Sequence, residues 1–268
     1  MLARTVTSGF HVVDRANWYG TWTLYVREVW RFLKTPVRSI FAPTATSLLF
    51  LAIFTLALGG TVREVKGVSL AEFLAPGLVM MAMVHAAFEN AAASLVQGKL
   101  LGNIVDILTP PLSPGEITFA LVFGGASHAL MTGAVLLVAM QPFVPIVPIH
   151  PVFVVFYAVA ASLLLAMVGV VAGLWAAKWD HLAAVTNFTV MPLMFLSGTF
   201  YSIERLPGAW HTASQFNPLF YVIDGFRYGF IDEADGVLGL GVVVVTILLA
   251  ALWLVCHRLI AIGYNLKA

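Results

Sequence analysis

The sequence predicts an all-α membrane protein with six transmembrane helices. Of its 268 residues, 60% are hydrophobic and only 10% are charged, whereas a soluble globular domain usually carries about 25% charged residues. Apolar runs of about 20 residues, the length of a helix that crosses a bilayer, recur along the chain. The composition therefore excludes an ordinary soluble domain. No cluster of Lys and Arg suggests a nucleic-acid partner, so the partner we expect first is the lipid bilayer.

We expect one domain over residues 1–268, beginning with a cytoplasmic N-terminus and an interfacial helix in residues 1–38. The stretch TWTLYVREVWRFLK, which Pro36 follows, alternates aromatic and basic residues at helical spacing. Its expected apolar face consists of Trp22, Tyr25, Val29, Phe32 and Leu33. An amphipathic helix rich in Trp and Arg is typical of a helix that lies in the headgroup region of a membrane.

The six-span core is expected over residues 39–256, and a cytoplasmic tail over 257–268. The six apolar runs cover about 39–60, 74–97, 117–141, 152–176, 183–201 and 237–256. The segment 202–236 is too polar to cross, and Pro207 and Pro218 divide it. We therefore expect a short outer re-entrant helical segment between spans 5 and 6.

The distribution of basic residues predicts the orientation. Six spans put both termini on one side of the membrane. Ten Lys and Arg residues fall on that side: Arg4, Arg15, Arg27, Arg31, Lys34, Arg38, Lys99, Lys178, Arg258 and Lys267. Four fall on the other side: Arg63, Lys66, Arg205 and Arg227. The positive-inside rule therefore predicts that both termini are cytoplasmic.

Four polar residues within the second and third spans form a candidate transport path or polar relay. They are His85, Glu89, Asn90 and His128. A carboxylate at the centre of a membrane helix costs about 2.5–3.5 kcal/mol on insertion scales, so Glu89 needs a partner or a wet cavity. His85 precedes it by four residues and shares its helical face. A packed interhelical hydrogen bond between the two spans is the structural alternative.

The same polar residues leave other functions open. His85, Glu89 and His128 could serve a proton-coupled secondary transporter or a membrane-embedded lipid-modifying enzyme as acids or bases. The inverted halves of many secondary transporters are not visible in the sequence. No fourth ligand completes a metal site from these three residues, so we predict none.

The stretch GKLLGNIVDILTPPLSPGE, residues 98–116, is a polar hairpin between the second and third spans. Its prolines and charges predict that it projects into water, where a soluble partner can bind it. Within it, Ile104, Ile107 and Leu108 are expected to form an apolar docking face beside Asp106. The phosphate-binding pattern GxxxxGK[ST] does not occur in the sequence, so any ATP hydrolysis must come from a separate chain.

Three motifs together resemble a known family. TPPLSPGEI closes the hairpin, FLSGTFYSIERLP ends the fifth apolar run, and NPLFYVIDGFRYG precedes the last span. With the basic N-terminal helix and six apolar runs, this order is similar to the permease subunits of type-2 ATP-binding-cassette (ABC-2) exporters. That group includes nodulation-factor, polysaccharide and drug-efflux members, and the resemblance covers nearly the whole chain.

The resemblance implies a permease subunit in the bacterial inner membrane, without catalytic residues of its own. It would work as a homodimer with two copies of a partner ATPase that binds the ATP and Mg. The cargo would be a lipid-like, glycan or drug-like substrate moved outward, along a path between two permease copies.

The resemblance also implies roles for individual residues. The ATPase-coupling residues would be Asn103, Ile104, Asp106, Ile107, Leu108, Thr109, Pro110, Leu112, Ser113 and Glu116. A structural motif of the outer segment would comprise Gly198, Pro207, Asn217, Pro218 and Arg227. On a helix, Asp224 lies three residues before Arg227 and could pair with it.

Overall fold

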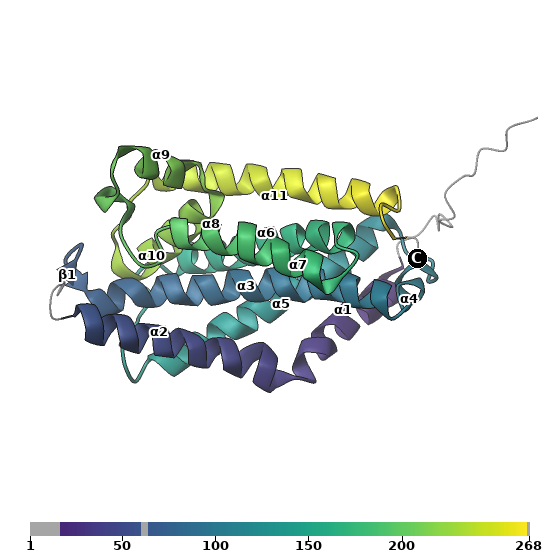
Figure 1. The fold of residues 1–268 in the computed structure, drawn as a ribbon, viewed down its shortest axis with the longest axis horizontal. Coiled ribbons are helices and arrows are strands. Elements are labelled where there is room, and N and C mark those ends of the chain that lie inside the picture. The colour runs from purple at the N-terminus through teal and green to yellow at the C-terminus, as the bar shows by residue number, and fades with distance from the viewer. Residues whose placement is uncertain (1–16, 60–63, 267–268) are drawn as a thin grey trace, which may run out of the picture.

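The computed structural model describes residues 17–59 and 64–266 and shows a bundle of long helices (Figure 1). Among these residues, five helices are long and apolar enough to cross a membrane. They are Val37–Ala57, which joins the π-helical turn η1 (Val37–Phe41) to α2 (Ala42–Leu58), then α3 (Leu70–Leu100), α5 (Pro114–Met140), α6 (Pro151–Trp175) and α11 (Leu238–Ala261). The prediction of a helical membrane protein is confirmed for this part of the chain.

The run expected as the fifth span, 183–201, forms shorter pieces. It falls on α7 (Trp179–Val185), the π-helical turn η2 (Thr186–Val190) and α8 (Met191–Leu196). Pro192, the second residue of α8, has no N–H to donate into the preceding turn, and a π-turn is a common accommodation of such an interruption. Pro43 is likewise the second residue of the helix that follows η1, so a proline accounts for both π-turns.

The segment from 202 to 236 folds as short helical pieces, as its prolines predicted. They are η3 (Ile203–Arg205), α9 (Gly208–Phe216) and α10 (Pro218–Ile231). Pro207 caps α9, and Pro218 occupies the first position of α10, where its missing N–H costs nothing. α10 is buried against α6 and α3 and therefore belongs to the core of the described protein.

Three further elements complete the described chain. Helix α1 (Trp18–Leu33) packs along α5, and α4 (Val105–Leu108) is a single turn between α3 and α5. Strands β1 (Glu64–Val65) and β2 (Val68–Ser69) pair antiparallel directly before α3. Lys66 and Gly67 both have positive φ at the centre of the connection, which is the geometry of a tight hairpin turn of type I′.

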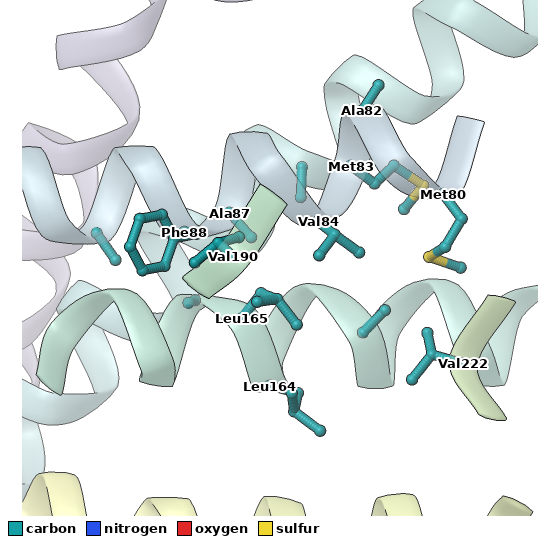
Figure 2. Close-up of a cluster of buried hydrophobic side chains, with 14 of the residues drawn as sticks. Met80, Ala82, Met83, Val84, Ala87, Phe88, Leu164, Leu165, Val190 and Val222 are labelled. Atoms are coloured by element: carbon teal, nitrogen blue, oxygen red, sulfur yellow. The ribbon is translucent and has the colours of Figure 1, made fainter. Parts of the chain in front are cut away.

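Helix α3 is the centre of the bundle, because it packs against α2, α5, α6 and α10. Figure 2 shows Val84 of α3 pointing toward α6 and Leu165 of α6 pointing toward α3, whereas Leu164 points away from α3. The close approach of these helices depends on Gly169 of α6, because a Cβ at that position would clash with the carbonyl oxygen of Phe88. Small residues at such crossings are how membrane helices gain close packing without a hydrophobic driving force.

Candidate functional site

A cavity of about 990 Å³ lies between α1, η1, α3 and α5. All four residues of the predicted polar path, His85, Glu89, Asn90 and His128, line it. Three of them, His85, Glu89 and Asn90, lie on α3, where positions 85 and 89 share one helical face, and His128 comes from the neighbouring α5. The structure thus brings the predicted residues together around one space.

Within the cavity, His85 and Glu89 form the accessible pair. The Nδ1 atom of His85 lies 3.7 Å from the Oε2 atom of Glu89, and the side chain of Glu89 is 53% exposed. A carboxylate with this exposure is solvated rather than packed against a partner helix. The wet-cavity alternative therefore describes Glu89 better than a buried interhelical hydrogen bond does.

Asn90 and His128, by contrast, each make a hydrogen bond that packs the helices together. The Oδ1 atom of Asn90 accepts a hydrogen bond of 2.9 Å from Arg31 of α1. The Nε2 atom of His128 lies 3.0 Å from the backbone oxygen of Ser39, and its ring stacks on Phe32 at 4.5 Å. Both side chains thus connect α1 and η1 to the bundle.

The proposed relay would need His128 to contact Glu89, and the hydrogen bond of His128 goes to Ser39 instead. Among residues 17–59 and 64–266, no group of three His, Cys, Asp or Glu residues is placed to hold a metal ion.

The most informative residue that the sequence analysis missed is Glu28, which is 1% exposed although it lies on the amphipathic helix α1. Its Oε1 atom accepts a hydrogen bond of 2.8 Å from the Ser94 hydroxyl on α3, and its Oε2 atom pairs with Arg31 at 2.9 Å. Arg31 also donates to the backbone oxygen of Asn90. A buried carboxylate is retained when its oxygens are satisfied in this way.

These contacts give α1 a buried face toward the bundle that the sequence analysis did not predict. Its buried stripe consists of Thr21, Leu24, Glu28 and Phe32. The last three of these residues are spaced four apart, which places them on one side of the helix. Trp22, expected on the apolar face, is 63% exposed. The helical spacing of Leu24, Glu28 and Phe32 was visible in the sequence, but a glutamate in the middle of the stripe concealed it. The exposed residues Trp18, Tyr19, Trp22 and Trp30 remain available to the membrane interface.

The predicted docking face of the 98–116 hairpin requires a correction. Ile104 and Ile107 are each 1% exposed and point into the protein, as does Leu112 at 3%. The helical part, α4, is also shorter than the expected 103–108, because Gly102 adopts a positive φ and the chain turns there. The side chain of Leu108 lies outside what the structure describes.

The exposed surface of this hairpin is made of other residues, and we call it the hairpin surface. It consists of Leu100, Leu101, Asn103, Val105 and Asp106. Thr109 and Ser113 are exposed as well, whereas Pro110 is half-buried.

Glu116, at the end of the hairpin, has a structural role. It forms a capping box with Ser113 at the start of α5, and it also accepts a hydrogen bond from the backbone N–H of Asn17. This single carboxylate therefore joins the beginning of α1 to the end of the hairpin, which gives the two elements one common anchor.

At the opposite end of the bundle, Arg227 of α10 is the anchor of the outer motif. It donates to the backbone oxygens of Gly198 at 2.7 Å and Thr199 at 3.3 Å, and its guanidinium lies 3.9 Å from the centre of the Phe73 ring. Gly198 has a φ of +79°, which favours glycine. Burial lowers the pKa of Arg227 to about 10, so it stays charged at neutral pH.

Asp224 does not pair with Arg227 as the sequence suggested. Among the described residues, Asp224 instead accepts hydrogen bonds from the backbone N–H groups of Asp235 and Gly236, at 2.7 and 2.9 Å. Asn217 caps α10 by accepting from the N–H of Leu219, and it donates to the backbone oxygen of Leu193. The outer motif is therefore a set of backbone contacts that fixes the turn after α8.

An ion-pair cluster joins the β-hairpin to this outer segment. The Nζ atom of Lys66 lies 2.6 Å from Asp235 and 3.0 Å from Glu204. Asp235 also accepts from the Ser202 hydroxyl and from the N–H of Ile203. Lys66 is more than a hundred positions away from Glu204 and Asp235 in the sequence, and no sequence pattern indicates that they are in contact.

Comparison with known proteins relates the chain to one family of transporters. A sequence model of the family described as "ABC-2 type transporter" matches residues 19–231. The chain is 32% identical over 251 residues to the inner membrane transport permease YadH of Escherichia coli K12, covering 94% of this chain and 98% of the relative. It is 28% identical over 214 residues to Nodulation protein J of Rhizobium leguminosarum bv. trifolii, covering 79% and 80%.

Proposed function

Because the chain belongs to the ABC-2 type transporter family, we propose that it is the permease subunit of an exporter driven by a separate ATPase. Two copies of the permease and two of the ATPase would make the complex, and the ATPase would bind ATP and Mg. The cargo is a lipid-like, glycan or drug-like substrate, moved outward across the bacterial inner membrane. The observation that carries the proposal is the cavity lined by charged residues between membrane helices.

The orientation follows from the basic residues. Arg27 lies on α1, Lys34 directly follows α1, Arg38 lies on η1, and Lys99 lies at the end of α3 next to the hairpin. The positive-inside rule then places α1, the hairpin and both chain termini on the cytoplasmic side. The α7–η2–α8 run, 18 residues at about 1.5 Å rise each, is long enough to complete a sixth crossing of about 27 Å.

A second copy of this chain explains how the cavity is kept from lipid. Pro43 of α2 and Trp179 of α7 are among its lining residues, so these two helices border it. A cavity that contains Glu89 and several basic side chains cannot face hydrocarbon without a large cost. A second permease packed against α2 and α7 would cover this side and place two such cavities along a shared path.

The ATPase is expected to contact the hairpin surface. Leu101 is 62% exposed and Val105 is 55% exposed beside Asp106, so apolar area and charge lie together there. Because Ile104 and Ile107 are buried in the bundle beneath them, a push on this surface is transmitted directly to the packed core. Glu116 extends that coupling to α1 through its bond to Asn17.

The test is affinity purification of the tagged full chain from native membranes, with ATP hydrolysis measured on the eluate. We expect an ATPase subunit to co-purify with the unchanged chain. Asp106→Arg should release it, whereas the matched control Glu233→Arg, an exposed charge reversal in the outer segment, should retain it. A chain that purifies alone, or equal retention by both variants, would contradict the proposal.

A further inference from the structure

We propose that the cavity beside α1 binds the anionic headgroup of an amphiphile, such as a phosphate or carboxylate group. This inference rests on the proposed function in one respect: it names the chemical class that the exporter would accept on the cytoplasmic side. Its evidence is the set of side chains around the cavity.

The charge of the lining favours an anion. Arg27, Arg31, Lys34 and Arg38 all line the cavity, and Glu89 is the single carboxylate among the described lining residues. The charge of Arg31 is balanced by Glu28. The other three cations are exposed and form no ion pair with any described residue. Three uncompensated cations around one space attract an anion and can hold it by charge-assisted hydrogen bonds.

A buried donor at the same cavity lacks a partner. Asn90 is 5% exposed, and its Nδ2 atom makes no hydrogen bond to any described residue, although its Oδ1 atom is bound by Arg31. An unmet buried donor destabilises the protein unless a ligand or water satisfies it. An oxygen of an anionic headgroup is the partner that both this amide and the neighbouring cations would accept.

Apolar side chains in the same lining suit the remainder of an amphiphile. Trp30, Phe32, Pro43 and Trp179 line the cavity together with the cations. Its volume of about 990 Å³ is at the upper end of the usual range for small-molecule sites. The arrangement therefore fits a charged head joined to an apolar body, and not a bare inorganic ion.

Glu89 divides the cavity by charge. It lies on α3 with His85, whereas the cations come from α1, η1 and the short link between them. A carboxylate repels a second anion, so the headgroup belongs on the side of α1 and η1. A site with one sign of charge on each wall discriminates between ligands of opposite charge.

The experiment uses the full chain in phosphatidylcholine nanodiscs and titrates octyl phosphate below its micelle-forming concentration. Octylphosphocholine, which has the same chain and a zwitterionic head, is the control ligand, and empty nanodiscs provide the blank. The cavity variant is Lys34→Gln with Arg38→Gln. The matched variant is Lys178→Gln with Arg258→Gln, which removes one Lys and one Arg that are exposed and do not line the cavity.

We expect octyl phosphate to bind the unchanged chain at least about tenfold more tightly than octylphosphocholine, and this preference to weaken with salt. The cavity variant should lose about tenfold in affinity, and the matched variant should bind as the unchanged chain does. An equal loss in both variants, which indicates general surface charge, or no preference for the phosphate would overturn the proposal.

A second arm identifies the source of the anion. Part of the phosphatidylcholine is replaced by phosphatidylglycerol and the titration is repeated. Competition by phosphatidylglycerol supports the site with a bilayer lipid as its natural occupant, whereas unchanged affinity supports it with a distinct cargo. The measurement needs no ATPase, so its failure is distinguishable from failure of the proposed function, which co-purification tests.

Discussion

Helices α3 and α11 show opposite relations between hydropathy and burial. Helix α11 is the most apolar of the five candidate spans, yet only 11% of its most apolar stretch is buried, whereas α3 is the least apolar and 78% of its stretch is buried. In water the more apolar helix would occupy the core. In a bilayer, lipid solvates apolar side chains as well as a neighbouring helix does. The helix with the most polar side chains therefore takes the central position, because only other helices supply partners for those side chains.

Their positions follow from this difference. α3 lies in the middle of the bundle and α11 at one edge (Figure 1). α11 buries a narrow stripe consisting of Gly241, Val245, Cys256 and Ile260. α3 carries His85, Glu89 and Asn90, which need the other helices and the cavity around them.

The largest expected effect comes from shortening the same side chain on each helix. Leu95 of α3 is 1% exposed and Leu254 of α11 is 62% exposed. Leu95→Ala should lower the free energy of unfolding by about 2–5 kcal/mol because it opens a cavity, and Leu254→Ala should change it by much less. Denaturant unfolding of the purified chain in detergent micelles measures both. Equal losses would mean that the surface of α11 is packed and not lipid-facing.

Glycines give a sharper version of the same test. A methyl group at Gly169 would clash with the carbonyl oxygen of Phe88, whereas Gly239, in the first turn of α11, has open space around it. Gly169→Ala should cost about 1–3 kcal/mol because α6 must move away from α3. Gly239→Ala should cost nothing and could gain up to about 1 kcal/mol through helix propensity. A neutral Gly169→Ala in thermal unfolding would contradict the close α3–α6 contact.

The smallest expected effect concerns the ion pair that links the beginnings of α3 and α11. Burial by itself lowers the pKa of Lys66, but its contacts with Asp235 and Glu204 outweigh burial and raise that pKa. A raised lysine pKa means that the stabilisation is fully present below the ordinary value of about 10.4 and is lost as the pH rises through the folded-state value.

Lys66→Met should therefore lower the free energy of unfolding by about 1 kcal/mol at neutral pH, since solvent screens part of the interaction. Melting temperatures recorded from neutral to strongly alkaline pH should show the unchanged chain and the variant converging above the folded-state pKa. Exposed Lys178→Met serves as the control. A constant difference at all pH values would show that the lysine acts through packing and not through its charge.

Local chemistry made the helices and their breaks predictable. The expected spans 117–141, 152–176 and 237–256 compare with α5 at Pro114–Met140, α6 at Pro151–Trp175 and α11 at Leu238–Ala261. Pro207 and Pro218 begin the helices of the outer segment because a proline's fixed φ and missing N–H act within a few residues. Membership of the family was likewise apparent from short motifs.

Only the tertiary structure decided which side chains face inward. Glu28 is buried because Ser94 of α3 and Arg31, one turn further along α1, satisfy its oxygens, and Ile104 is buried because the hairpin folds back onto the bundle. Lys66 meets Asp235, although more than half of the chain's length separates them in sequence. Hydropathy measures how strongly a residue prefers to leave water. In a membrane, the lipid-facing side and the bundle-facing side of a helix both satisfy that preference. The partner on each face is a property of the packed bundle.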